Sequence, residues 1–253
     1  MSGIARFNRS LAAAALLLAA GASAATAQPS VEAFYSGKQI AVIVGSGPGG
    51  GYDLLARLMS RHLGRHIPGK PTIIVQNMPG AGSLNAANHL ANVAPKDGSV
   101  IALIQRGMLV AKMMNPGGTR FDLATLNWIG SLNKETGMTV AWHTTPHMTV
   151  KDLFEKELIV GGITNVDPET TPKLYNVLLG TKFKVITGYN STAQIALAIE
   201  RGEVQGIADW SWSSVKAQRP HWIRDKQIRF LLQGALQKDP ELPDVPSATV
   251  ISL

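Results

Sequence analysis

Two glycine-rich stretches of the sequence have the residue types and spacing to bind an anion through the backbone. The first, residues 45–51, reads GSGPGGG and separates an apolar run from an amphipathic one. Glycine lets the backbone approach a ligand closely, and the start of the helix that follows offers unpaired N–H groups and a partial positive charge. The second, residues 79–83, reads PGAGS and adds further N–H groups and a hydroxyl. Two such loops side by side would grip a carboxylate without any Arg or Lys.

The first stretch also contains the spacing Gly45-x-Gly47-x-x-Gly50 of the dinucleotide fingerprint. That site requires an acidic residue about 20 positions further on, at the end of the second strand. Residues 65–77 contain no Asp or Glu, and no Gly-Lys-Ser/Thr of a P-loop is present. The sequence therefore favours a small anion over NAD, and no cofactor is expected. Asp53 is interpreted as a helix cap or a ligand contact.

Other catalytic and metal-binding patterns are missing. His62 and His66 stand four apart, but the glutamate of H-E-x-x-H is missing and the flanking arginines would repel a cation. His143 and His147 straddle a turn at Pro146, so we expect all four as surface histidines and no metal site. The chain has no cysteine and no G-x-S-x-G motif. We expect no enzyme, with an exported hydrolase using an unmarked Ser-His-Asp set as an alternative.

The elements that position these loops follow a β-loop-α pattern. Apolar runs at 39–44, 72–77 and 99–104 are predicted strands, and each glycine-rich loop follows the end of one of them. The runs TVAWHT, LIVGGIT, KFKVITGY, VQGIADWSW and IRFLLQGAL predict a second series. Two such series, with crossings near 130–140 and 230–235, predict two lobes that face each other across a cleft. In ADWSWSS an extended strand would bury Trp210 and Trp212 and turn Asp209 and Ser211 toward the cleft.

The N-terminus has the parts of a secretory signal peptide. Arg6 and Arg9 precede an apolar run at 11–20, and A-x-A sequences ending at Ala24 and Ala27 follow, the second being the preferred cleavage site. Without a lipid-anchored cysteine, the exported protein is expected in the periplasm of a two-membrane bacterium. Removing the signal lowers the formal charge of +7 to about +5, with the basic residues scattered. This charge favours small anions, and nucleic acid is not an expected partner.

The sequence resembles the periplasmic solute receptors of tripartite tricarboxylate transporters, the Bug or TctC-like proteins, whose motifs occur in the same order along the chain. The match is carried by Lys38–Leu103, then by VKDL, ITGYNSTAQIALAIERGEVQG and IRFLLQGALQKDPELPDVPSA. The resemblance implies an α/β, two-lobed periplasmic-binding-protein (Venus-flytrap) fold, each lobe a mainly parallel sheet flanked by helices, joined by two crossing strands. It also implies a monomer that captures a small carboxylate by hinge closure and delivers it to a membrane permease, without catalysis. A ligand-sensing partner of a signalling membrane protein would share this fold and stays open as an alternative.

The resemblance also implies the ligand-binding residues. They are Pro48, Gly49, Gly50, Gly51, Asp53, Ala81, Gly82 and Ser83 in the first lobe, and Gly161, Gly162, Ile163, Thr164, Tyr189, Asn190 and Asp209 in the second. Ser83 replaces the final glycine of the usual P-G-A-G-G and is expected to alter the carboxylate pocket. The second-lobe sequence GGITNVD departs from the usual G-S-x-G pattern of the family, so the identity of the ligand stays open.

The expected organisation is a signal peptide at 1–27, the first lobe at 28–132, the second lobe at 133–230 and a return segment to the first lobe at 231–253. Members of the resembled family continue well past the LPDVP segment, so we expect a truncated return segment.

Overall fold

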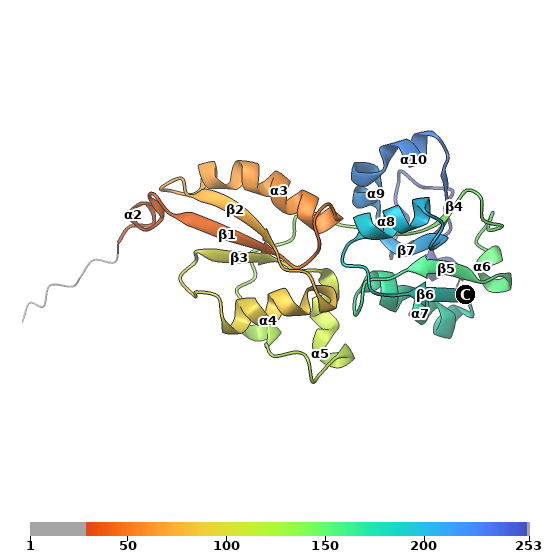
Figure 1. Cartoon of the computed structure of the whole chain (residues 1–253), viewed down its shortest axis with the longest axis horizontal. Coiled ribbons are helices and arrows are strands. Elements are labelled where there is room, and N and C mark those ends of the chain that lie inside the picture. The colour runs from red at the N-terminus through yellow and green to blue at the C-terminus, as the bar shows by residue number, and fades with distance from the viewer. Residues whose placement is uncertain (1–28, 252–253) are drawn as a thin grey trace, which may run out of the picture.

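The computed structural model describes residues 29–251, so the expected signal peptide at 1–27 lies outside the described residues. Two α/β lobes lie end to end along the long axis of the molecule (Figure 1). Each lobe is built around its own sheet, of three strands in the first lobe and five in the second. The strands of both sheets form where the apolar runs of the sequence predict them, and loops and helices separate them as expected.

The first lobe is a three-stranded parallel sheet with β1 (Gln39–Val44) at its centre, between β2 (Thr72–Asn77) and β3 (Val100–Leu103). The β-branched side chains of β1 favour a strand, and Val42 and Val44 are fully buried because helices cover both faces. Figure 1 shows α3 (Gly51–Leu63) on one face and α4 (Leu84–Asn92) on the other. The remaining helices are α2 (Val31–Tyr35), η1 (Gly64–His66), η2 (Ala81–Ser83), η3 (Arg106–Val110), α5 (Ala111–Met114) and η4 (Leu123–Thr125).

The second lobe is a mixed sheet. Its strands β5 (Leu158–Gly161), β6 (Phe183–Ile186) and β7 (Gly206–Ser211) run parallel, while β4 (Gly137–Trp142) is antiparallel to both β7 and β8 (Ile228–Gly234). Its helices are α6 (Asp152–Glu155), α7 (Asp167–Leu179), α8 (Thr192–Glu200), α9 (Trp212–Gln218), α10 (Pro220–Arg224) and α11 (Ala248–Ile251). One apolar cluster continues from this lobe into the first, where it includes Leu84 and Met108.

The path of the chain between the lobes differs from the expectation. In the described residues the lobes are connected once, through the segment between β3 and β4. The expected return of residues 231–253 to the first lobe is wrong for the part that the structure describes. β8 extends to Gly234 in the second sheet, and the Gln233 amide donates to the carbonyls of Leu242 (3.0 Å) and Val245 (2.7 Å). Ala248 and Ile251 then pack against the core of the second lobe.

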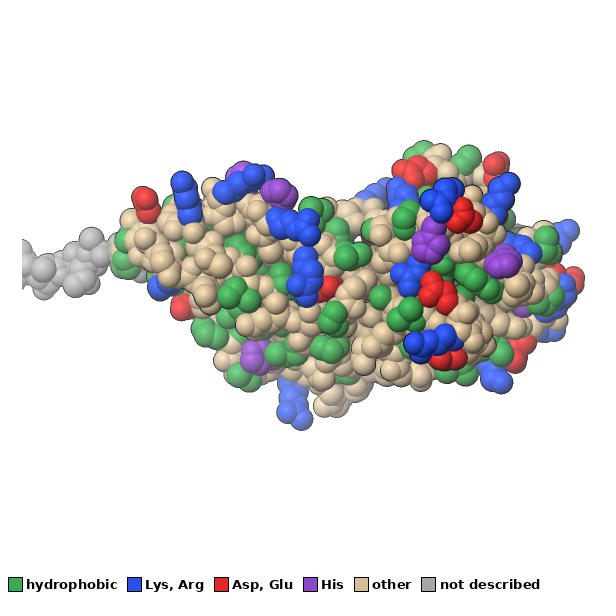
Figure 2. Space-filling view, turned by 45° about the horizontal axis from the view of Figure 1, so that its top comes forward, with side chains coloured by type: hydrophobic (Ala, Val, Ile, Leu, Met, Phe, Trp, Pro, Cys, Tyr) green, Lys and Arg blue, Asp and Glu red, His purple; other side chains and the backbone are tan. Residues whose placement is uncertain are grey.

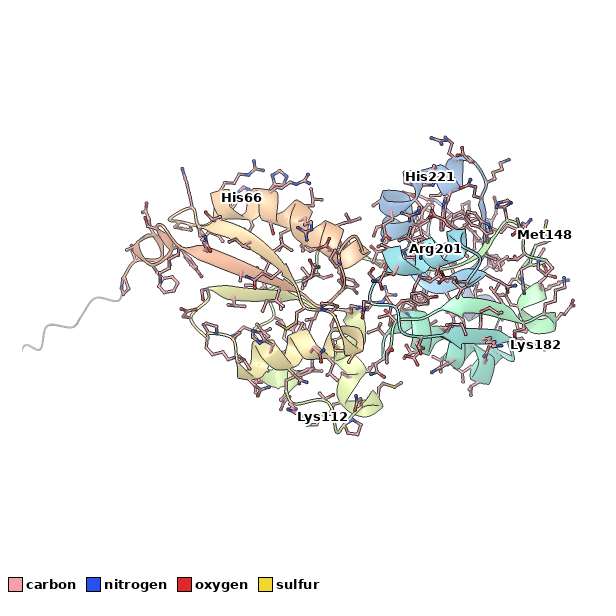
Figure 3. The ribbon with its side chains drawn as sticks, viewed as in Figure 1. His66, Lys112, Met148, Lys182, Arg201 and His221 are labelled. Carbon is pink, nitrogen blue, oxygen red and sulfur yellow. The ribbon has the colours of Figure 1, made fainter. Side chains whose placement is uncertain are left out.

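The surface agrees with the expected scatter of charge on the face that Figure 2 shows, where Lys and Arg side chains alternate with other types and form no continuous stripe. His62, His66 and His143 are exposed, and Figure 3 shows His66 on the outer side of the first lobe. His147 is fully buried, contrary to expectation, because the turn after β4 is fastened to β8 by Arg229, which donates to Thr145 O at 2.9 Å.

Residues 29–251 hold no group of three or more His, Asp or Glu side chains placed to bind a metal ion. Over the same range, none of the helices has the length and apolar character of a membrane span.

Candidate functional site

The candidate site lies where the carboxyl ends of the strands of the two lobes face each other. The loops that follow β1, β2 and β3 meet the loops that follow β5, β6 and β7, which is the end of a parallel sheet where ligands bind. The lobes touch here, since the Gly47 N–H donates to the Asn190 carbonyl at 2.9 Å. Two small cavities lie side by side between the loops and share Gln105 and Ile163 in their walls.

The first, which we call the backbone cavity, encloses about 50 Å³. Three successive residues of η2 adopt left-handed backbone conformations, with φ of 44° at Ala81, 61° at Gly82 and 80° at Ser83. Ala81 and Gly82 begin this 3-10 turn, so their N–H groups have no acceptor within it. Consecutive free N–H groups in such a turn form a concave anion-binding surface. The lining residues are Gly45, Gly80, Ala81, Gly82, Gln105, Ile163, Thr164, Gly188, Tyr189 and Asn190.

Ser83 fixes the shape of this cavity from behind. Its side chain is fully buried, and Ser83 Oγ donates to the Gly45 carbonyl at 2.7 Å and accepts from the Gln105 N–H at 3.1 Å. The single hydroxyl therefore connects the loops that follow all three strands of the first lobe. A glycine at this position would lack both bonds.

Asp53 fixes the glycine-rich loop of α3 in a similar way. Its buried carboxylate accepts hydrogen bonds from the Gly49 N–H, Arg57 Nε and Asn77 Nδ2, each at 2.9 Å. Asn77 also donates to the Ser46 carbonyl at 3.0 Å, which links the end of β2 to the loop. Burial by itself would raise the pKa of Asp53, but these hydrogen bonds outweigh it and hold the pKa below its usual range.

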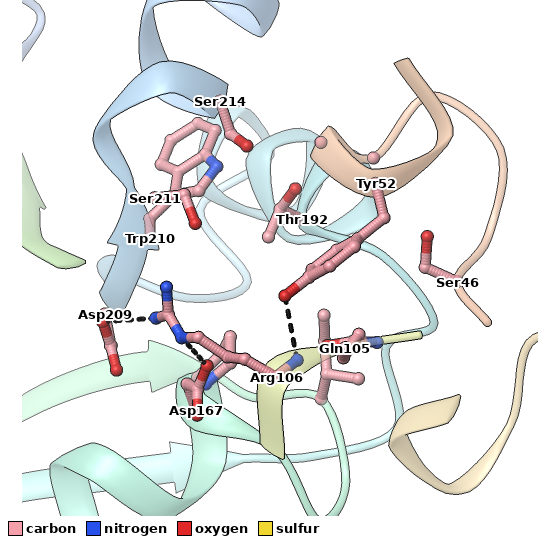
Figure 4. Close-up of a pocket in the computed structure, with 14 residues that line it drawn as sticks. Ser46, Tyr52, Gln105, Arg106, Asp167, Thr192, Asp209, Trp210, Ser211 and Ser214 are labelled. Carbon is pink, nitrogen blue, oxygen red and sulfur yellow. Dashed lines mark hydrogen bonds and ion pairs between the residues drawn. The ribbon is translucent and has the colours of Figure 1, made fainter. Parts of the chain in front are cut away.

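The second cavity, the arginine cavity, encloses about 30 Å³ and contains an ion-paired cluster that spans the cleft (Figure 4). Arg106 of the first lobe pairs through Nε with Asp167 and through Nη2 with Asp209 at 2.9 Å, and both acidic residues belong to the second lobe. The Arg106 N–H also donates to the Tyr52 hydroxyl at 3.1 Å. The wall consists of Ser46, Gly50, Gly51, Tyr52, Gln105, Arg106, Ile163, Asp167, Pro168, Thr192, Asp209, Trp210, Ser211 and Ser214.

Asp209 is held rigidly in this cluster. Its φ of 57° is left-handed although it lies within a strand, and its second carboxylate oxygen accepts from Thr171 Oγ1 at 2.7 Å. The neighbouring position in β4 must be Gly137, because a Cβ there would overlap the Asp209 carboxylate. A strained backbone that the surroundings over-determine is typical of ligand sites.

The cluster also shifts the acidity of its members. Burial alone would lower the pKa of Arg106, but the carboxylates of Asp209 and Asp167 outweigh it and raise the pKa above its ordinary value. Burial raises the pKa of Asp167, and the Asp209 carboxylate raises this pKa further. The positive charge of Arg106 lowers it but offsets only part of the increase. Burial likewise raises the pKa of the Tyr52 phenol. The one guanidinium is thus the fixed positive charge of a site that holds two carboxyl groups.

Several glycines of the first lobe are required because the second lobe approaches them. A Cβ at Gly51 would collide with Ser214 Oγ, and one at Gly50 would lie 3.0 Å from the Ser191 Cβ. A Cβ at Gly82 would lie 2.5 Å from the Thr164 carbonyl oxygen. These glycines therefore permit contact between the lobes as well as close approach to a ligand.

The residues predicted from the sequence fall into two groups in the structure. Gly50, Gly51, Ala81, Gly82, Ile163, Thr164, Tyr189, Asn190 and Asp209 line one of the two cavities. Pro48, Gly49, Asp53, Ser83, Gly161 and Gly162 do not line either, and Gly162 uses its N–H in a bond to the Ile186 carbonyl.

The sequence analysis missed the charged centre of the site. Arg106 and Gln105 directly follow the third strand, so the rule that selected the first two loops could have selected this one too. Asp167 starts the helix after the GGITNV loop, where it is the first acidic residue. Trp210 and Trp212 are buried as expected, but the expected separation of two faces is wrong, because Trp212 begins α9 and Trp210 lines the arginine cavity together with Asp209 and Ser211.

Comparison with known proteins places this geometry in a known fold. No protein-family model matches the chain. A curated relative, the UPF0065 protein in the tcbD-tcbE intergenic region of Pseudomonas sp. (strain P51), is 25% identical over 256 residues, covering 96% of this chain and 71% of the relative. Among solved structures, the periplasmic binding protein BugD matches with a TM-score of 0.73 at 18% identity, over 84% of this chain and 71% of that one.

Two further solved structures were determined with ligands. Rpa4515 of R. palustris with adipate has a TM-score of 0.68 at 19% identity, over 85% of this chain and 72% of that one. MatC (Rpa3494) from Rhodopseudomonas palustris with bound malate has a TM-score of 0.68 at 20% identity, and the match covers 85% of this chain and 72% of that one. The chain therefore has the two-lobed fold of periplasmic binding proteins, and in fold it is similar to the receptors that its sequence motifs resemble.

Proposed function

We propose that this protein is a periplasmic solute receptor that captures a small carboxylate between its lobes. The observation that carries the proposal is the backbone cavity between two touching lobes, lined by Ala81 and Gly82 at the start of a 3-10 turn, where their N–H groups have no acceptor within the turn. A carboxylate accepts such N–H groups readily, and loops of both lobes reach it there. Relatives of the same fold bind adipate and malate, which supports this ligand class.

The single described connection between the lobes gives the capture step a mechanism. With the lobes apart, the N–H groups of the first lobe are open to solvent and meet the ligand first. The second lobe then closes over it by a hinge motion in the segment between β3 and β4. The closed form presents a surface to the permease of a tripartite tricarboxylate-type transporter, and the receptor itself acts as a monomer without catalysing a reaction. Its signal peptide is removed near Ala27 on export.

The test is thermal unfolding of the exported chain against a panel of mono-, di- and tricarboxylates and their neutral analogues. A ligand that binds only the native state adds about 2.7 kcal/mol of stability at 100 times its Kd, so a true ligand gives a clear rise in Tm. A panel in which no carboxylate raises the Tm would overturn the proposal.

A pair of glycine variants shows whether the backbone cavity is the site. Gly82→Ala introduces a Cβ against Thr164 at a left-handed φ of 61°, whereas Gly180→Ala introduces one into open space at a φ of 78°. Both variants carry the same kind of backbone strain, which costs roughly 1 kcal/mol. We expect only Gly82→Ala to abolish the carboxylate-dependent rise in Tm. Equal loss in both variants would contradict the assignment of the site.

A further inference from the structure

The arginine cavity contains polar groups that neither the fold nor the backbone cavity uses. The indole Nε1–H of Trp210 and the hydroxyl of Ser46 are both buried and have no hydrogen-bond partner among the described residues. Trp210 is 1% exposed and Ser46 is 3% exposed, and both line this cavity (Figure 4). A buried donor without an acceptor is unfavourable in a folded protein, so each of the two marks a position in the cavity wall where an acceptor is missing.

The charge of the cavity excludes one class of acceptor. Arg106 carries one positive charge and is already paired with the carboxyl groups of both Asp167 and Asp209, so the cluster has no spare positive charge for a second carboxylate. Asp209 cannot turn away, because Thr171 and the backbone conformation hold its carboxylate in place. A second carboxylate of the ligand would therefore meet like charge at short range, in a partly buried site where charges are poorly screened.

The two cavities are close enough for one ligand to reach both, since Gln105 and Ile163 belong to both walls. Space for the far end of a ligand is available as well. Beyond Arg106, Gly51, Tyr52 and Asp209, the cleft continues into a wider hollow of about 640 Å³. The two unpartnered donors come from different lobes, Ser46 from the first and Trp210 from the second, and lie on opposite sides of Tyr52 in Figure 4.

We propose that the arginine cavity is a second subsite that takes an uncharged hydrogen-bonding end of the ligand, such as a carboxamide, and disfavours a second carboxylate. The carboxamide oxygen accepts from Trp210 Nε1–H, and its N–H groups face the carboxylates of the cluster. This inference rests on the proposed function and narrows its ligand class to monocarboxylates with a neutral polar end. It contrasts with the dicarboxylates found in relatives of the same fold.

The experiment measures the affinity of the exported chain for matched pairs of probes by calorimetry. The pairs are succinate and succinamate, glutarate and glutaramate, and adipate and adipamate, which differ within each pair only in one carboxylate or carboxamide. We expect the monoamide of the best-binding pair to bind about tenfold or more tightly than its dicarboxylate, the factor that one lost hydrogen bond of about 1.4 kcal/mol would produce. The corresponding diamides lack the carboxylate for the backbone cavity and should not bind.

Two variants remove the unpartnered donors without breaking any bond of the unliganded protein. Trp210→Phe should lower the affinity for the monoamide by about fivefold to tenfold and leave the affinity for the dicarboxylate nearly unchanged. Ser46→Ala removes the donor on the other side of Tyr52 and should leave both affinities nearly unchanged. Trp142→Phe is the matched control, because Trp142 lies in the same lobe, packs against Trp222 and does not line either cavity. Asp167→Asn removes one negative charge and should shift the preference toward the dicarboxylate.

The outcomes separate this inference from the proposed function. Equal or tighter binding of the dicarboxylates to the wild-type protein overturns the second subsite and leaves the carboxylate receptor standing. A preference for the monoamide that Trp210→Phe leaves intact overturns the assignment of Trp210 Nε1–H as the donor. Absence of binding by every probe, mono- or dicarboxylate, contradicts the carboxylate receptor and this inference together.

Discussion

At the scale of single residues, the site separates positions that line the cavities from positions that hold the loops. Asp53 and Ser83 are of the second kind, because their polar atoms are fully used by neighbouring backbone and side-chain groups. Arg106 is of the first kind, and its charge is shared with the opposite lobe. Substitutions should therefore affect stability in one group and ligand binding in the other.

Replacing Asp53 with Ala tests the positions that hold the loops. The change leaves the Gly49 N–H and the Asn77 amide without their acceptor, so we expect a loss of about 2–3 kcal/mol in the free energy of unfolding at pH 7. Urea-induced unfolding measures it. Asp225→Ala is the control, because Asp225 pairs with Arg224 on the surface and should change the stability little.

The contribution of Asp53 should also depend on pH in a defined direction. Its pKa in the folded protein lies below the unfolded value of about 3.9, so the stabilisation is fully present above that value. It is lost as the pH falls through the lower pKa of the folded state. The difference in stability between the wild type and Asp53→Ala should therefore be constant from pH 7 to 5 and shrink below about pH 4. A difference that grows on acidification would contradict the network.

At the scale of elements, the start of α3 has to meet the start of α9 across the cleft. Gly51 opens α3 without a left-handed φ, so an Ala there is allowed by the backbone and is excluded only by Ser214 of the other lobe. The glycine at this helix position is thus explained by contact between elements rather than by local conformation.

Gly51→Ala should weaken carboxylate binding about tenfold or more while the unliganded protein melts within a few degrees of the wild type, since Ala is the better helix former by about 1 kcal/mol. Adding Ser214→Ala removes the collision and should restore part of the affinity. Gly117→Ala is the matched control, because a Cβ there meets nothing within 4 Å. If the double variant binds no better than the single one, steric contact with Ser214 is not the cause.

The segment after β8 is attached to the second sheet by one fully buried side chain. Gln233 donates to Leu242 and Val245 and accepts from the Asp239 N–H at 2.8 Å. Gln233→Met keeps the volume but leaves these backbone groups unpaired, so we expect a loss of about 2–4 kcal/mol in the free energy of unfolding. Limited proteolysis should also cut residues 235–247 faster in this variant. An unchanged cleavage rate would show that other contacts hold the segment.

At the scale of the whole molecule, the closed arrangement rests on contacts that cross the cleft. Arg106 supplies the ionic ones, while the Gly47–Asn190 backbone bond and the shared apolar cluster supply the rest. Without Arg106, Asp167 and Asp209 remain as two unneutralised carboxyl groups on one face of the second lobe.

Arg106→Gln should therefore shift the unliganded protein toward a more open form. Because the Arg106 side chain is 36% exposed, solvent screening limits the loss to about 1–2 kcal/mol. Small-angle X-ray scattering should give a larger radius of gyration for this variant than for the wild type. Arg219→Gln, whose partner Glu200 lies in the same lobe, is the control and should leave the radius unchanged. Equal radii for all three proteins would show that the ion pairs do not hold the lobes together.

The sequence by itself determined the local structure and the first-lobe loops of this protein. Periodicity predicted β1 and β2 with the bounds that the structure has, because β-branched apolar runs bounded by glycine and proline have few alternatives. The same local rules predicted the glycine-rich loops at the carboxyl ends of the strands as the place of the candidate site.

Only the tertiary structure decided which distant residues meet. The pairing of Arg106 with Asp167 and Asp209, the burial of His147 and the attachment of residues 235–251 to the second lobe all depend on contacts between segments far apart in the chain. No local pattern encodes these contacts, because charge pairing and burial depend on the summed packing of many elements. Gly50, Gly51 and Gly82 illustrate the difference. Their spacing is visible in the sequence, but the residues of the second lobe that exclude a side chain there are known only from the structure.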